Sequence, residues 1–91
     1  MTYTIELTPK ARRQLRGINK YDRHALPRIK ARIDGLAYNP RPQGVKKLSG
    51  AESLYRVRVG DYRIIYEIQD KALVVLALYH TRYRAGSKNG A

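Results

Sequence analysis

The spacing of apolar residues predicts a short strand at the start of the chain, then a helical region, and then a second half of strands. Residues 2–8 alternate between polar and apolar side chains, with Tyr3, Ile5 and Leu7 on one side, as in a half-buried strand. The pair Thr8-Pro9 then has the pattern of a helix N-cap followed by proline at the first helical position. The chain is therefore expected to begin with a strand that leads directly into a helix.

Two short helices are predicted between this strand and residue 39. In the first, apolar residues recur at helical spacing, and Gly17-Ile18-Asn19 marks its expected end. Asp22 is the expected N-cap of the second helix, and Pro27 lies early enough to bend its first turn without preventing it. The apolar face of this helix consists of Leu26, Ile29, Ile33 and Leu36. We expect the two helices to form a hairpin that ends at the run Asn-Pro-Arg-Pro, residues 39–42.

Strand patterns occupy the rest of the chain. Residues 54–59 and 62–68 alternate, residues 73–79 are mainly apolar, and a turn separates each strand from the next. The predicted order is β-α-α-β-β-β, an α+β fold in which an antiparallel sheet carries the N-terminal helical hairpin on one face. The 91 residues are expected to form one domain, with residues 85–91 as a frayed tail.

A two-residue turn at Gly60-Asp61 would set the pairing of the strands beside it. Arg58 then faces Arg63, with Arg56 on the same side of the sheet, away from the helices. Like charges directly opposite each other destabilise a sheet by roughly 0.2–1 kcal/mol, so an anion bound between the guanidinium groups would explain the cluster. Guanidinium suits phosphate because it donates in a planar fork and stays charged. Arginines splayed into water are the alternative explanation.

The end of the last strand is predicted to reach the same place. If its turn is centred on Asp70-Lys71, His80 lies opposite Asp61 on the arginine side, where an imidazole could transfer protons near neutral pH. A histidine that only ends a strand beside Asp61 fits the pattern equally well. The run Arg-Tyr-Arg at residues 82–84 adds charge at this rim, together with a tyrosine that could stack on a base.

Charge dominates the composition. Nineteen lysines and arginines against seven acidic residues give a net charge of +12, and such self-repulsion is best explained by a polyanionic partner such as nucleic acid. Lys46 and Lys47, just before the first long strand, are expected to extend the electropositive track. The arginines of the helical hairpin are expected to form a polar helix face, with RNA contact or protein docking as alternatives. They are Arg12, Arg13, Arg16, Arg23, Arg28 and Arg32.

The residues that several kinds of catalytic and metal site require are absent from this sequence. There is no cysteine, and His24 and His80 are far apart with no ligand cluster, so no disulfide, thiol nucleophile or metal site is expected. A serine triad, paired carboxylates and a phosphate-cradling glycine loop are also missing, and no cofactor is predicted. Without a signal-peptide pattern or an apolar run of ~20 residues, the chain is expected to be cytoplasmic. Its arginines, histidine and tyrosines suit phosphodiester cleavage.

The chain resembles the RelE/ParE toxin superfamily. The similar stretches are Lys-Lys-Leu-Ser-Gly at residues 46–50 and Leu-Tyr-Arg-Val-Arg-Val-Gly-Asp-Tyr-Arg-Ile-Ile-Tyr-Glu-Ile at residues 54–68. The part from Gly60 to Tyr66 is fairly specific, whereas the helical region is not. The resemblance covers nearly the whole chain and implies the β-α-α-β-β-β fold expected from the spacing of apolar residues.

A RelE-type member, by this resemblance, is a ribosome-dependent endoribonuclease. It enters the A site and cleaves the exposed messenger RNA codon through attack by a ribose 2′-hydroxyl. Basic residues of the family, often lysines, occur where Arg56 and Arg58 stand here, and Arg63 matches closely.

The resemblance also implies roles for the end of the chain. The late-strand arginine of the family falls on Arg82 or Arg84, and Tyr83 is the nearest counterpart of a tyrosine that orients the substrate. Because arginine does not readily lose a proton, we hypothesise that His80 takes over proton transfer. The candidate catalytic residues are Arg56, Arg58, Arg63, His80, Arg82 and Tyr83, and the candidate RNA contacts are Lys46, Lys47 and Arg84.

A protein partner is implied as well. Family members are neutralised by an antitoxin encoded beside them, here a RelB-like protein, and contact operator DNA only as part of that complex. An acidic antitoxin would also account for the charge of +12. Two other functions fit the same residues: a ParE-type toxin that inhibits DNA gyrase, and a non-catalytic basic RNA-binding module. The arginines across the strand hairpin favour the RelE type, because they suit RNA phosphate.

Overall fold

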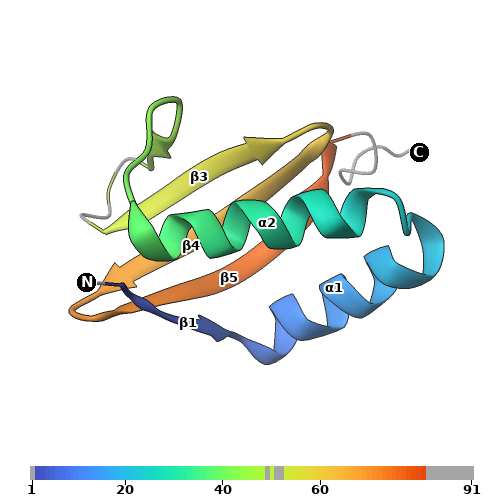
Figure 1. Cartoon of the computed structure of the whole chain (residues 1–91), viewed down its shortest axis with the longest axis horizontal. Coiled ribbons are helices and arrows are strands. Elements are labelled where there is room, and N and C mark those ends of the chain that lie inside the picture. The colour runs from blue at the N-terminus through green and yellow to red at the C-terminus, as the bar shows by residue number, and fades with distance from the viewer. Residues whose placement is uncertain (1, 49, 51–52, 82–91) are drawn as a thin grey trace.

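A computed structural model describes residues 2–48, 50 and 53–81. Along the chain the elements are β1 (Thr4–Leu7), α1 (Pro9–Tyr21), α2 (Ala25–Tyr38), β2 (Lys46–Lys47), β3 (Leu54–Val59), β4 (Tyr62–Gln69) and β5 (Ala72–His80). The strands form one sheet in the order β1-β5-β4-β3-β2, and both helices lie on the same side of it (Figure 1). The predicted α+β class, with a helical hairpin on one face of a sheet, is confirmed.

The sheet is mixed, whereas a wholly antiparallel sheet was expected. β1 pairs with β5 in parallel, with Thr4 opposite Ala72 and Leu7 opposite Val75. The pairings between β5, β4, β3 and β2 are antiparallel. Alternation along a strand indicates which side chains are buried but not which strand lies next to it. It therefore could not predict that β1 is parallel to its neighbour. β2 was not predicted either, because two adjacent lysines show no alternation.

α1 ends later than predicted. The expected stop at Gly17–Asn19 is wrong, because a single glycine costs only about 1 kcal/mol inside a helix and the helix continues to Tyr21. Asp22 does not cap α2 as expected, since the residue before α2 is His24, whose side chain makes no capping bond. The Asp22 carboxylate instead accepts a hydrogen bond from the Tyr62 hydroxyl at 3.0 Å, which ties the turn between the helices to β4.

The core lies between the helices and one face of the sheet. Five residues of β3 and β4 are buried there: Tyr55, Val57, Tyr62, Ile64 and Tyr66. The helices contribute Ala11, Ile18, Ala25, Ile29, Ile33 and Leu36. Burial of each large aliphatic side chain contributes about 1.5–3 kcal/mol, so this layer fixes the sheet and therefore the direction of the side chains on its other face.

A β-bulge changes the pairing in the second half of β5. Gln69 pairs with Ala72 across the predicted turn, and Tyr66 pairs with Val75. The register then shifts, so that Ile65 pairs with Ala77 and Leu76 is the extra residue. Because side chains alternate along a strand, every β5 side chain beyond the bulge lies on the face opposite to the one expected without it.

α1 supplies the hydrogen bonds that hold this bulge. Thr8 caps the helix as predicted, accepting from the Ala11 N–H at 3.0 Å, and its hydroxyl donates to the Leu76 carbonyl at 2.8 Å. Further along α1, Gln14 Oε1 accepts from the Leu78 N–H at 2.7 Å. Backbone groups that a bulge removes from the strand ladder need other partners, and these two side chains provide them.

Candidate nucleic-acid interface

The side of the sheet away from the helices, called here the open face, is not covered by any element that the structure describes. On it Arg58 lies opposite Arg63, and Arg56 lies opposite Ile65, as predicted. Arg58 is exposed, whereas Arg56 and Arg63 are half-buried. These three arginines are called the arginine face.

β2 extends the arginine face by one lysine. Lys46 pairs with Arg56 and therefore lies on the open face beside it. Lys47 pairs with Tyr55, a core residue, so its register places it on the helix side of the sheet. The predicted electropositive track thus continues through Lys46, while Lys47 belongs to the other side.

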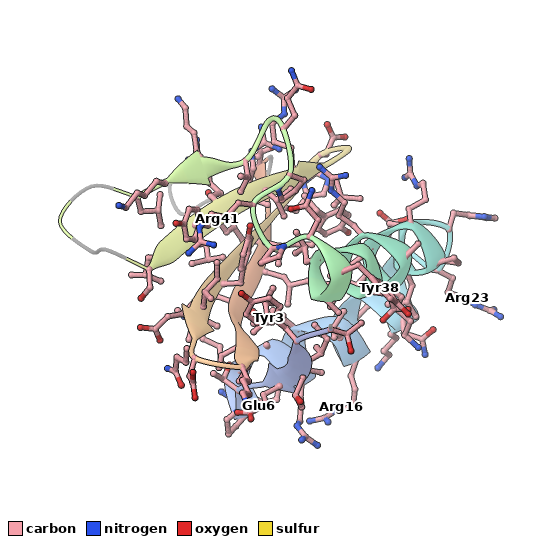
Figure 2. All side chains as sticks on the ribbon, turned by 60° about the vertical axis from the view of Figure 1, so that its left-hand side comes forward. Tyr3, Glu6, Arg16, Arg23, Tyr38 and Arg41 are labelled. Carbon is pink, nitrogen blue, oxygen red and sulfur yellow. The ribbon has the colours of Figure 1, made fainter. Side chains whose placement is uncertain are left out.

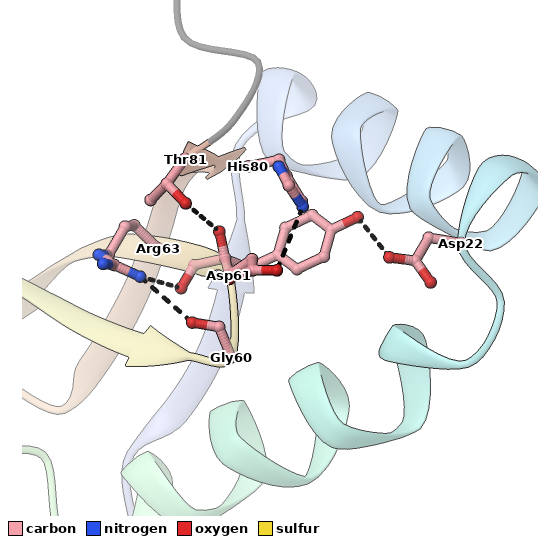
Figure 3. Close-up of polar contacts among 7 residues, drawn as sticks. Asp22, Gly60, Asp61, Arg63, His80 and Thr81 are labelled. Carbon is pink, nitrogen blue, oxygen red and sulfur yellow. Dashed lines mark hydrogen bonds and ion pairs between the residues drawn. The ribbon is translucent and has the colours of Figure 1, made fainter.

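The β3–β4 turn anchors Arg63. Gly60 has a φ of +59°, in the region that favours glycine, and with Asp61 it forms the predicted two-residue turn. Nη1 of Arg63 donates to the carbonyls of Gly60 at 3.4 Å and of Tyr62 at 3.2 Å (Figure 3). The carbonyl of Asp61 accepts from Thr81, from its N–H at 2.8 Å and its hydroxyl at 3.0 Å. Three consecutive carbonyls therefore hold Arg63 and the end of β5 against one turn.

His80 lies on the helix side of the sheet, which corrects its predicted position on the arginine side. Because of the bulge it pairs with Tyr62 and not with Asp61, and it meets the Tyr62 ring edge-on at 4.8 Å between ring centres. Its Nε2 lies 3.9 Å from the Asp61 carboxylate, and its side chain is only 15% exposed. The histidine ends a strand beside Asp61, so its position does not support a role as general base on the arginine face.

Tyr79 lies on the face of the sheet that was expected for His80. It pairs with Arg63 on the open face and is half-buried. Sequence reasoning missed it because Leu73–Leu78 is apolar throughout and gives no sign of the bulge. The other predicted residues at this rim lie outside the described residues; they are Arg82, Tyr83 and Arg84.

The strand carboxylate nearest to the arginine face belongs to Glu67 and has other contacts. Glu67 is four residues along β4 from Arg63, about 13 Å at the usual strand rise. Its carboxylate accepts from the Ser53 hydroxyl at 3.3 Å and the Gln69 amide at 2.7 Å. Asp61, in the turn beside Arg63, lies 3.9 Å from His80.

A stacked tyrosine pair supports the β2–β3 edge from inside. The rings of Tyr55 and Tyr66 lie 5.7 Å apart, and the Tyr66 hydroxyl donates to the Pro40 carbonyl at 2.6 Å. Burial, and to a lesser extent the neighbouring Tyr55, raises the pKa of Tyr66 to about 12. Nε of Arg41 donates to the Tyr55 hydroxyl at 2.9 Å, and this hydrogen bond raises the pKa of Arg41. These contacts hold the segment that leads from α2 to Lys46.

The described residues therefore provide fixed positive charge and one phenol on the open face. No three His, Asp or Glu side chains in residues 2–48, 50 and 53–81 are grouped to hold a metal ion. None of the helices described is long and apolar enough to cross a membrane. Guanidinium groups that stay charged at any working pH can bind phosphate and stabilise added negative charge on it.

Comparison with known proteins assigns the family. A family model described as the ParE toxin of the type II toxin–antitoxin system parDE matches residues 5–84. The chain belongs to this toxin family, within the RelE/ParE superfamily.

Individual relatives agree with this assignment. A Methanocaldococcus jannaschii protein named as a candidate toxin, RelE1, is 26% identical over 80 residues, which cover 82% of this chain and 86% of the relative. The archaeal RelE–RelB complex of Pyrococcus horikoshii contains a chain that is 33% identical, with a TM-score of 0.76, 93% of this chain covered and 100% of that one. The RelBE2 toxin–antitoxin complex of Mycobacterium tuberculosis gives 28% identity and a TM-score of 0.73, with 88% and 92% covered.

Proposed function

We propose that this toxin is a ribosome-dependent endoribonuclease of the RelE type, which inhibits translation by cutting messenger RNA in the ribosomal A site. The arginine face carries the proposal. Arg58 lies opposite Arg63 with Arg56 and Lys46 beside them, and like charges so placed repel one another. A phosphate of the message bound between them would turn this repulsion into attraction.

The proposed reaction needs negative charge to be stabilised on phosphorus. The 2′-oxygen of a ribose forms a bond to the adjacent phosphorus, and the bond from phosphorus to the 5′-oxygen of the next nucleotide breaks. The 2′-hydroxyl loses a proton, and the departing 5′-oxygen gains one. Between these events the phosphorane carries extra charge, which donors already in place stabilise best. Arg63, held by the turn carbonyls, is the arginine-face residue whose geometry is most restricted.

Proton transfer is assigned differently from the sequence hypothesis. His80 lies on the helix side, whereas the Tyr79 side chain shares the open face with Arg63. We propose Tyr79 as the described group best placed to exchange a proton with the reacting oxygens. The roles of Arg82 and Tyr83 in catalysis, and of Arg84 in RNA binding, remain part of the proposal on the strength of the family resemblance.

We also propose that a RelB-like antitoxin neutralises the toxin. The relatives from Pyrococcus horikoshii and Mycobacterium tuberculosis are both structures of toxin–antitoxin complexes. An acidic partner would offset the net charge of +12. A hollow of about 520 Å³ also lies between α1 and the ends of β4 and β5, next to Tyr21, which is 81% exposed. An apolar segment of a partner would bury this surface.

One observation favours a second candidate function, inhibition of DNA gyrase. The matching family model is described by ParE, whose branch of the superfamily acts on gyrase and shares the fold. The fold alone does not decide between the two targets. The paired arginines on an open sheet face favour RNA phosphate as the ligand.

Primer extension on a message translated in a purified system tests the proposal. We expect cuts at codon-spaced positions that require both the toxin and ribosomes. A parallel assay follows the supercoiling of plasmid DNA by purified gyrase. An intact message together with inhibited supercoiling would refute the RelE-type activity and establish the second candidate.

A further inference from the structure

The β2–β3 edge of the sheet carries positive charge on both of its sides. The open side holds Lys46 and the arginine face, whereas the helix side holds Arg28, Arg32 and Arg41, called here the α2 row. We propose that the α2 row is a second phosphate-binding surface, which holds a stretch of RNA backbone other than the strand at the arginine face. This inference rests on the RNA-directed function proposed above.

Arg28 brings the α2 row to the same turn that holds Arg63. Both terminal nitrogens of Arg28 lie 3.8 Å from the point where a side chain on Gly60 would begin. The guanidinium group of Arg28 therefore lies against the turn from the helix side. Arg63 is bound to the Gly60 carbonyl of the same turn but belongs to the open face. The turn is therefore flanked by two arginines from different layers.

Arg32 continues the row one helical turn later, about 6 Å along the axis of α2. Its Nε is buried and has no hydrogen-bond partner among the described residues. Buried donors almost always have an acceptor, and a bound anion or water is one way to supply it. Beside Arg32 lies a hollow of about 140 Å³ at the C-terminal half of α2, which leaves space for an acceptor to approach.

Arg41 ends the row at the other end of the edge. Its guanidinium lies over the Tyr55 ring, 5.6 Å from the ring centre, and is fixed by the bond from Nε to the Tyr55 hydroxyl. Figure 2 shows Arg41 next to β3, whereas Arg16 and Arg23 extend away from the helical hairpin. Arg32 and Arg41 both lie close enough to Tyr66 to favour its ionised form, against the burial that raises its pKa. The two guanidinium groups therefore converge on one part of the edge.

The arginines of the row form no ion pair within the described chain. Residues 25–33, 39–48 and 54–60 contain no aspartate or glutamate, and the acidic residues that border these ranges are Asp34 and Asp61. Arg28, Arg32 and Arg41 have no acidic partner within 4.0 Å among the residues that the structure describes. Like charges one helical turn apart repel each other, so the spacing of Arg28 and Arg32 works against the isolated helix. A polyanion that spans several of these groups removes the repulsion.

The surroundings of the row favour a phosphate backbone over an acidic protein. Protein partners bind mainly through apolar or aromatic anchors that enter pockets. The apolar hollow of about 520 Å³ lies elsewhere, beside His80, and the hollow next to Arg32 is only about 140 Å³. The row instead presents positive charges at regular intervals, as the arginine face does. Arg28 and Arg32 are about 6 Å apart along their helix, and Arg56 and Arg58 are about 6.6 Å apart along β3. A nucleic-acid strand presents its phosphates in the same repetitive way.

The test compares two double variants with the same loss of charge. R28Q/R32Q removes two members of the row, and R12Q/R16Q removes two exposed arginines with the same spacing from α1. Binding to a fluorescent RNA hairpin and to purified ribosomes is measured over a range of KCl concentrations. We expect R28Q/R32Q to bind at least about tenfold more weakly at moderate salt, with a log–log salt dependence shallower by about 1.5–2, because two phosphate contacts are lost. R12Q/R16Q should change both quantities much less.

Further measurements separate this inference from the proposed function. The single-turnover cleavage rate at saturating ribosomes should be the same in R28Q/R32Q as in the unmodified toxin. If no message is cleaved but RNA binding depends on the row, the catalytic proposal fails and the α2 row stands. Equal losses in the two double variants, no loss in R28Q/R32Q, or a loss confined to binding of a polyglutamate peptide would each overturn the inference. R28Q alone, at an exposed position, repeats the test if the double variant unfolds at a lower temperature.

Discussion

At the scale of single residues, Tyr66 shows how polar groups beneath the candidate site are satisfied. The side chain is fully buried, at 0% exposure, and its hydroxyl donates to the Pro40 carbonyl at 2.6 Å. Burial raises its pKa to about 12, because the ionised form would lose solvation and could not donate this bond. The hydrogen bond from the Tyr66 hydroxyl therefore links the segment after α2 to the sheet, and this bond requires Tyr66 to be protonated.

This coupling predicts a loss of stability at alkaline pH. Because the folded-state pKa of Tyr66 lies above the ordinary value of about 10, its contribution is complete below that pH and is lost as pH rises through about 12. Tyr66→Phe should lower the free energy of unfolding by about 1–3 kcal/mol at neutral pH, since the Pro40 carbonyl loses its donor. Urea unfolding between pH 8 and 12 measures both effects, and the difference between the two proteins should shrink at the alkaline end. A constant difference would contradict the coupling.

The positions of His80 and Tyr79 show which part of the candidate site could not be predicted from the sequence. The residue types that carry the proposed chemistry were visible in the sequence, and the placement of Arg56, Arg58 and Arg63 was correct. The faces of His80 and Tyr79 were exchanged, because one extra residue in β5 reverses every later side chain. The hydrogen bonds that hold this bulge come from Thr8 and Gln14, more than 60 residues away in sequence. Local patterns do not contain such contacts.

At the scale of elements, the β3–β4 hairpin was predictable because its turn is two residues long. Gly60 needs the positive φ of +59° that such a turn demands, and this fixes the register of both strands. The end of α1 and the direction of β1 were not predictable in the same way. Each depends on packing against parts of the chain that are distant in sequence.

We also predict that Arg58, a residue of the arginine face, destabilises the β3–β4 hairpin. Arg58→Thr removes the like charge opposite Arg63 and should raise the free energy of unfolding by roughly 0.2–1 kcal/mol, while weakening RNA binding. Lys47→Thr on the neighbouring strand is the control, because Lys47 pairs with Tyr55 and its removal relieves no directly opposed charge. Urea unfolding of both variants at low salt gives the comparison. Equal stability changes in the two would show that the opposed arginines do not strain the sheet.

At the scale of the whole molecule, charge is the property that the fold organises. A net charge of +12 is spread over both sides of the β2–β3 edge and over the helical hairpin. Composition alone predicted a polyanionic partner. Only the strand register showed which cations share a face, and only the tertiary structure showed that Arg28 reaches the turn between β3 and β4.

Anions should therefore stabilise the folded molecule in a specific order. Raising ionic strength from about 0.01 to 0.15 M shortens the screening length from about 30 to about 8 Å and should raise the melting temperature. Inorganic phosphate should raise it further than chloride at matched ionic strength, because it binds the folded arginine face. In Arg56→Thr/Arg58→Thr the advantage of phosphate should shrink, and the part that remains comes from the α2 row and from the general stabilising effect of phosphate on folded proteins. A melting temperature that depends on ionic strength alone would argue against a phosphate site.

The central claim is that the arginine face performs the cleavage, and single-turnover cleavage of a ribosome-bound message tests it most directly. Arg63→Ala is compared with Arg12→Ala, which removes one exposed arginine from α1 and the same charge. Both variants are assayed at saturating ribosomes, so that differences in binding do not enter the rate. We expect a rate at least about 100-fold lower for Arg63→Ala, because a fixed donor to the phosphorane is lost, and a nearly unchanged rate for Arg12→Ala. Cleavage by Arg63→Ala at the unmodified rate would contradict the central claim.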